Sequence, residues 1–236
     1  MEQRLSFKDG IKDALPICLG YISVAIAFGV LAIQKGLPLW APPLISVLNL
    51  SGTGQFASID LLNVTASYLE IFCAILVINA RYFLMSVSLS QLIPPNLEWW
   101  KKCIIAFGNT DEVFAIATGK DLPLNFKYLS GLILCSFLGW TTGTVVGTFA
   151  GNIVPEVLTS ALGISLYAMF LAIIIPPAID QKPIFFTVIL SALFSIALYF
   201  TPFLNSLSSG WSIIICGITA SVISALKFPV KEADDE

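Results

Sequence analysis

The amino-acid sequence predicts an all-α, polytopic membrane protein of about eight transmembrane helices, with both termini in the cytoplasm. Of its 236 residues, 57% are apolar and only 11% are charged, and the mean hydropathy is +0.89. Soluble domains carry about 25% charged residues, so this composition excludes a water-soluble enzyme or binding module. We interpret residues 1–236 as a single integral membrane domain.

Long apolar runs mark the individual helices, because a transmembrane helix needs roughly 20 predominantly apolar residues. Runs of suitable length lie at residues 14–33, 41–62, 69–92, 129–150, 158–179, 184–201 and 209–227. A shorter run at 103–119 is interrupted by the sequence GNTDE at residues 108–112. The connections between the runs are short and rich in proline, which leaves no room for a separate soluble domain.

Loop charge indicates that the run at 103–119 also crosses the membrane. Lysine and arginine accumulate in cytoplasmic loops. With eight spans and a cytoplasmic N-terminus, only Lys35, Lys101 and Lys102 fall outside. The cations on the cytoplasmic side are then Arg4, Lys8, Lys12, Lys120, Lys127, Lys182, Lys227 and Lys231. If 103–119 did not cross, every later loop would change sides and the bias would be reversed.

A polar cluster, NLSGTGQF at residues 49–56, lies in the middle of the second run. Two interpretations are open. Ser51, Gly52 and Gly54 permit a close crossing between helices, or they mark a helix that is broken at mid-depth. A break frees backbone N–H and C=O groups, which a membrane tolerates only where they line a cavity or meet a ligand. Ser51 and Gln55 share one helix face because they are four residues apart.

Three charged residues lie within apolar runs, where an arginine or an acid costs about 2.5 to 3.5 kcal/mol to insert. Arg81 lies near the middle of the run at 69–92, and Asp111 and Glu112 lie near the middle of the run at 103–119. Counted from the shared outer loop, Arg81 and Asp111 differ in depth by about 4 to 5 Å. A salt bridge between the two runs is therefore feasible. The two acids point about 100° apart, so one of them is left over.

Three roles are open for these charges. Arg81 and one acid could form a fixed structural pair, an acid could contact the substrate directly, or the acid without a cationic partner could load and release a proton. The guanidinium fork of Arg81 also suits a carboxylate ligand.

Several chemistries are excluded by residues that the sequence lacks. It contains no histidine, which removes imidazole metal ligands and histidine proton relays. The five cysteines are scattered singly, as small apolar residues are. Phosphate-cradling and hydrolase motifs are missing, and a net charge of −3 gives no basic patch for nucleic acid. We expect no enzyme activity, no cofactor and no metal site.

Four short motifs occur in order along the chain: Gly20-Tyr21 with AFG at 27–29, Gly52 with QF at 55–56, Asn79 with Arg81, and TDEVF at 110–114. At these spacings they resemble the AzlC family of bacterial branched-chain amino acid permeases and exporters. The resemblance implies export of valine, leucine, isoleucine and methionine across the inner membrane, driven by the proton-motive force. It also implies a small AzlD-type membrane subunit as partner. Tyr82 stands where family members often carry a histidine, so a histidine proton step is not available here.

We therefore predict a secondary amino acid exporter of the bacterial inner membrane; the alternative is a passive channel or a permease for another small metabolite. The residues predicted to contact the substrate are Ser51, Gly52, Gly54, Gln55, Asn79 and Arg81. Asp111 and Glu112 are the predicted ion-coupling residues.

Overall fold

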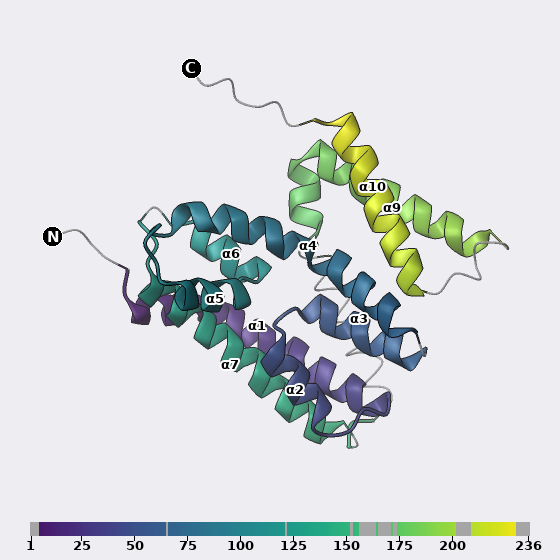
Figure 1. The fold of residues 1–236 in the computed structure, drawn as a ribbon. Helices are drawn as coiled ribbons and strands as arrows, with labels where there is room; N and C mark the ends of the chain where they lie inside the picture. The colour runs from purple at the N-terminus through teal and green to yellow at the C-terminus, as the bar shows by residue number, and fades with distance from the viewer. Residues whose placement is uncertain are drawn as a thin grey trace. The chain divides into compact units, whose positions relative to one another are not determined.

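The structure is a computed structural model that describes residues 5–64, 66–120, 122–151, 153–155, 164, 171, 174–201 and 209–229. Its helices are α1 (Phe7–Gln34), α2 (Ala41–Leu48), α3 (Gly52–Asn63), α4 (Tyr68–Leu92), α5 (Trp99–Phe107), α6 (Asp111–Thr118), α7 (Phe126–Ala150), α9 (Lys182–Phe200) and α10 (Ser209–Lys227) (Figure 1). The described residues contain no β-strand. The all-α prediction is confirmed.

Among the described residues, five helical segments are long and apolar enough to cross a membrane: α1, α4, α7, α9 and Gly210–Lys227 of α10. The polytopic membrane fold is therefore confirmed. The predicted spans 41–62 and 103–119 each consist of two shorter helices, α2 with α3 and α5 with α6. Most of the predicted span 158–179 lies outside the described residues, so the total of eight spans stays a prediction.

The chain divides into two compact units. The first comprises Met1–Ile59 and Asn79–Leu166, and the second comprises Asp60–Ile78 and Tyr167–Glu236. Both boundaries near residues 60 and 79 fall inside helices, α3 and α4. The single domain over 1–236 stays a prediction.

The first unit is built on α1 and α7, which lie side by side (Figure 1). Glycines at positions 139, 143 and 147 of α7 and at position 151 directly after it repeat every four residues and so share one face. A Cβ atom at Gly143 would lie 2.5 Å from the backbone oxygen of Ile22, and one at Gly147 would lie 2.2 Å from that of Ile26. The absence of side chains at this seam lets the two backbones approach closely, as in small-residue crossings of membrane helices.

The packing of α1 against α7 is parallel. Gly131 lies against Phe7, Gly139 against Cys18 and Gly151 against Ile33, so residue numbers rise together along both helices. If both helices cross the membrane, a parallel pair requires an odd number of crossings between them. The runs at 41–62 and 69–92 supply two, so the parallel packing supports the assignment of 103–119 as a third.

The second unit contains the first part of α4 together with α9 and α10. Leu61, Ala74 and Ile214 form a buried apolar cluster. Glu70 is only 5% exposed, and its carboxylate accepts a hydrogen bond of 3.1 Å from the backbone N–H of Gly210 at the start of α10. An acid at this position complements the positive end of the helix dipole.

Candidate functional site

Both mid-membrane polar clusters are breaks between two helices. α2 ends at Leu48 and α3 begins at Gly52, with Asn49 in an extended conformation at φ −147° and ψ 118°. The second break lies between α5 and α6, where Thr110 is extended at φ −81° and ψ 169°. Of the two interpretations of residues 49–56, the broken helix is confirmed. The break at 108–110 appeared in the sequence only as an interruption of an apolar run.

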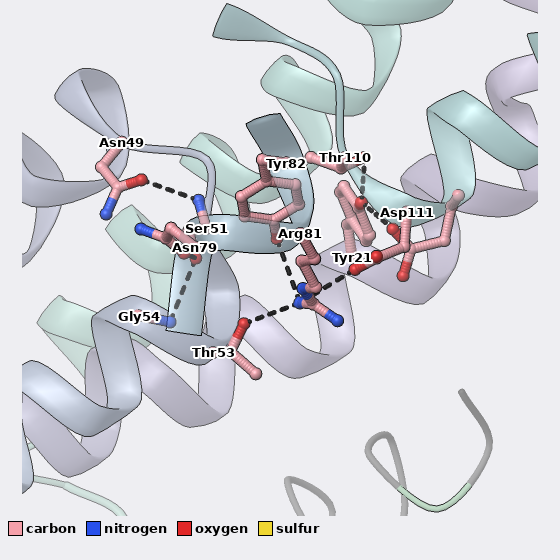
Figure 2. A network of polar contacts seen from close by, with 11 residues as sticks. Tyr21, Asn49, Ser51, Thr53, Gly54, Asn79, Arg81, Tyr82, Thr110 and Asp111 are labelled. Carbon is pink, nitrogen blue, oxygen red and sulfur yellow. Dashed lines mark hydrogen bonds and ion pairs between the residues drawn. The ribbon is translucent and has the colours of Figure 1, made fainter. Parts of the chain in front are cut away.

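Ser51 organises the first break (Figure 2). Its backbone N–H donates to Asn49 Oδ1 at 2.9 Å, and its Oγ accepts from the backbone N–H of Gly54 at 3.1 Å. Ser51 therefore caps the N-terminus of α3 in the manner of an N-cap serine. The same hydroxyl donates to Asn79 Oδ1 at 2.5 Å, which fixes the break to α4.

Gln55 is fully buried and holds the end of α2 in place. Its Oε1 accepts from Trp140 Nε1 at 3.1 Å and from Ser46 Oγ at 3.2 Å. Its Nε2 donates to the backbone oxygen of Asn49. Gly52 faces the same tryptophan, because a Cβ atom at Gly52 would lie 2.6 Å from the indole ring. In this arrangement Gln55 and Gly52 shape the break, and neither residue lines the cavity that is described below.

The second break approaches α7 and α1. A Cβ atom at Gly108 would lie 2.2 Å from the side chain of Ile133, so only glycine fits there. Thr110 is the N-cap residue of α6, but its hydroxyl makes no capping hydrogen bond. Thr110 Oγ1 instead lies within hydrogen-bonding distance, 2.8 Å, of Tyr21 Oη on α1. The first N–H groups of α6 therefore have no side-chain cap.

The three partly buried charges form one ion pair and, among the residues that the structure describes, leave one acid without a cationic partner. Arg81 Nη2 lies 2.9 Å from Asp111 Oδ2 and donates to Thr53 Oγ1 at 3.0 Å and to the Tyr82 hydroxyl at 3.2 Å (Figure 2). Within the described part of the chain, Arg81 Nε is buried without a hydrogen-bond partner. Glu112 accepts a hydrogen bond from the Tyr21 hydroxyl. The predicted salt bridge is present, with Asp111 as the partner and Glu112 as the spare acid.

A cavity of about 220 Å³ lies where the two breaks meet. Its lining comes from the end of α2 with the first break, from the end of α5 with the second break, and from Tyr82. Asn109 is part of this lining and is 3% exposed. Its Nδ2 donates to Ser86 Oγ at 3.1 Å, whereas its Oδ1 has no partner among the described residues.

The predicted site residues therefore divide into two groups. Ser51 lines the cavity, whereas Asn79 and Arg81 lie behind it and contact Ser51 and Tyr82. The residues that the sequence-based prediction missed are Tyr21, Tyr82, Asn109 and Thr110. A signal for two of them was present, since an Asn-Thr pair directly before two acids is a typical helix N-terminus. No group of acids and cysteines in the described residues could hold a metal ion.

Comparison with known proteins gives a consistent result. The model of the AzlC protein family matches residues 16–154. The inner membrane protein YgaZ of Escherichia coli K12 is 30% identical over 228 residues, which cover 93% of this chain and 91% of that protein. A membrane protein of Archaeoglobus fulgidus is 35% identical over 72% of this chain and 75% of its own. The branched-chain amino acid transport protein AzlC of Bacillus subtilis is 24% identical over 75% of this chain and 70% of its own. No solved structure matches.

Proposed function

The chain belongs to the AzlC family of membrane proteins, and we propose that it is a secondary transporter that exports branched-chain and other hydrophobic amino acids across the bacterial inner membrane. The observation that carries this proposal is the meeting of two helix breaks at one cavity. Transporters commonly bind their substrates at the ends of discontinuous helices near the middle of the bilayer.

The four helix ends at the cavity suit a zwitterion. Ser51 and Thr110, which directly precede α3 and α6, line the cavity, and so do Leu48 and Phe107 at the ends of α2 and α5. Helix N-termini attract a carboxylate through free N–H groups, and C-termini attract an ammonium through free carbonyl groups. Of the two helix starts, that of α6 has no side-chain cap from Thr110, whereas Ser51 already caps α3. The acids in the first turn of α6 reduce its attraction for a carboxylate while Glu112 is ionised.

The remaining lining favours a small apolar side chain. Leu48, Leu50 and Phe107 provide apolar surface next to the helix ends. A volume of about 220 Å³ lies below the range of about 300–1,000 Å³ that is typical of sites for larger ligands. An amino acid with an aliphatic side chain matches both the size and the mixed polarity.

Glu112 is the proposed ion-coupling residue. Asp111 already faces Arg81 at 2.9 Å, so its charge is balanced. Glu112 has the Tyr21 hydroxyl as its hydrogen-bond donor, and a carboxylate held by a neutral donor can exchange a proton without leaving a cation unpaired. We assign Arg81 and Asp111 to positioning and Glu112 to proton exchange. A small AzlD-type subunit is the proposed partner, on the strength of the family resemblance.

The test is transport of labelled valine in proteoliposomes. The wild-type protein should show exchange of valine for valine and should respond to an imposed pH gradient. Glu112→Gln should abolish the response to the gradient, while exchange at saturating valine continues. A wild-type protein that moves valine without acceleration by valine on the opposite side would point to the passive channel instead.

Glu98→Gln is the matched control. Glu98 precedes α5, and hydrogen bonds from the Lys101 ammonium and the Trp100 indole hold its pKa below the usual range. It therefore stays ionised at neutral pH and exchanges no proton. Glu98→Gln should keep the response to the gradient. Equal responses from Glu112→Gln and the wild type would refute the assignment of Glu112.

A further inference from the structure

A second cavity of about 180 Å³ lies between the C-terminal part of α4 and α5. One of its sides is apolar, with Leu89, Ile93 and Ile105. Polar groups line it as well, including Ser86 and Ser90 of α4. The first turn of α5 carries Lys101 and Lys102, which the charge distribution places outside, so this cavity faces the outer end of the molecule.

The two cavities are adjacent. Ala106 and Asn109 belong to the lining of both. Asn109 therefore lies between the cavity at the helix breaks and the outer cavity. Its hydrogen bond of 3.1 Å to Ser86 Oγ links the second break to α4. The lining that the two cavities share is one amide side chain and one small apolar residue.

The side-chain oxygen of Asn109, Oδ1, also indicates a ligand. The residue is 3% exposed, and this oxygen has no hydrogen-bond partner in the part of the chain that the structure describes. A buried acceptor without a donor is costly. An ammonium group that occupies either cavity would supply the missing donor.

We propose that the outer cavity is a second binding site for the same amino acid, occupied on the way from the helix breaks to the outside. This inference rests on the proposed function. Asn109 Oδ1 accepts from the ammonium, and Lys102, which lines the cavity and is exposed, provides a cation for the carboxylate. Leu89, Ile93 and Ile105 contact the aliphatic side chain. The ligand class is a zwitterion with an apolar side chain.

Serines of α4 allow a matched experiment. Ser90 lines the outer cavity, whereas Ser88, two residues earlier, lines neither cavity. Ser90→Cys and Ser88→Cys are treated in intact cells with a membrane-impermeant thiol reagent, and labelling of each peptide is measured by mass spectrometry. Ser90→Cys should react about tenfold faster than Ser88→Cys, because the reagent reaches position 90 through the open cavity. Position 88 lies outside both cavities, on a face of the proposed membrane helix where lipid keeps a thiol protonated. Valine should slow the labelling of Ser90→Cys.

A blocking variant tests the path itself. Ser86→Phe should fill the outer cavity and lower valine efflux about tenfold, whereas Ser88→Phe should leave efflux unchanged, since α4 presents position 88 on another face. If Ser86→Phe fails to reach the membrane, Ser90→Phe at the exposed rim replaces it. Equal labelling of positions 88 and 90, no labelling of position 90 in intact cells, or labelling that valine does not slow would overturn the outer site.

The two proposals can fail separately. Wild-type valine efflux together with unprotected position 90 overturns the outer site and leaves the proposed function standing. A wild-type protein that moves no valine in proteoliposomes overturns the proposed function and, with it, the identity of the ligand in the outer cavity.

Discussion

The ion pair between Arg81 and Asp111 can be broken without a change of shape by Asp111→Asn. Two opposite unit charges 2.9 Å apart attract by about 6 kcal/mol at an effective dielectric constant of about 20. The two side chains are 34% and 21% exposed, so solvent reduces this upper limit. Exposed pairs contribute about 0–1 kcal/mol, and breaking a buried pair costs about 3–5 kcal/mol. We expect a loss of about 1–3 kcal/mol for Asp111→Asn.

A double-mutant cycle with Arg81→Gln separates a structural role from a role in binding. Each single variant should lower the melting temperature in detergent by about 2–12 °C, at about 2–4 °C per kcal/mol for a chain of this size. The double variant should recover part of this loss, because neither charge is then left unpaired. If Arg81 only pairs with Asp111, the double variant also recovers valine exchange. If the buried Nε of Arg81 serves the substrate carboxylate, stability returns and exchange does not.

The control for this cycle is Arg81→Lys. It keeps the positive charge but loses the buried Nε and the planar guanidinium that places Nη2 near Thr53, Tyr82 and Asp111. It should therefore be more stable than Arg81→Gln and still impaired in exchange. Additive effects of the two single variants on melting temperature would refute the reasoning, because a pair at 2.9 Å must be coupled.

Two further predictions concern the framework around the site. Gly143→Ala should destabilise the protein by about 1–3 kcal/mol through overpacking, because its Cβ would lie 2.5 Å from Ile22 O. The control Gly20→Ala, with no atom within 4 Å of its Cβ, should be neutral or stabilising by up to about 1 kcal/mol. Melting temperatures in detergent measure both effects, and equal losses of stability would contradict the close packing of α1 and α7. Trp140→Phe removes one of the hydrogen-bond donors to Gln55 Oε1 and should lower the stability of the protein by about 1–3 kcal/mol. Valine exchange should also be slower, because the end of α2 is held less firmly. A normal melting temperature together with normal exchange would contradict the positioning role of Gln55.

The sequence predicted those features of the fold that depend on local composition. Apolar runs identified the long helices, and glycines with a serine at residues 51–54 made a broken second span one of two interpretations. The second break was harder to predict, because residues 103–119 form a short run whose interruption also fits a loop. The Thr110 N-cap followed by two acids is a local signal for a helix start, and it could have identified α6 directly.

The rotation and pairing of the helices could not be predicted from local composition. Helical geometry left Asp111 and Glu112 equally eligible for Arg81, and the choice depends on Tyr21, which α1 brings to Glu112 from a distant part of the sequence. Gln55 was predicted to contact the substrate from the same helix face as Ser51, whereas in the structure it is buried and accepts a hydrogen bond from Trp140 of α7. Contacts between residues 85 or more positions apart determine both outcomes, and no single-sequence pattern encodes them.

Export driven by a proton gradient requires one side chain at which binding of a proton weakens binding of the amino acid, and the reverse. The four helix ends at the cavity contribute partial charges of about +0.5 and −0.5 that nearly cancel, and Arg81 cancels Asp111. An ionised Glu112 then leaves the region with one net negative charge, which favours the ammonium of the substrate, and protonation of Glu112 removes that attraction. Protonation of Asp111 would instead leave Arg81, whose side chain is 34% exposed, without its anionic partner. Of the two acids, only Glu112 can therefore exchange a proton for the substrate without that penalty.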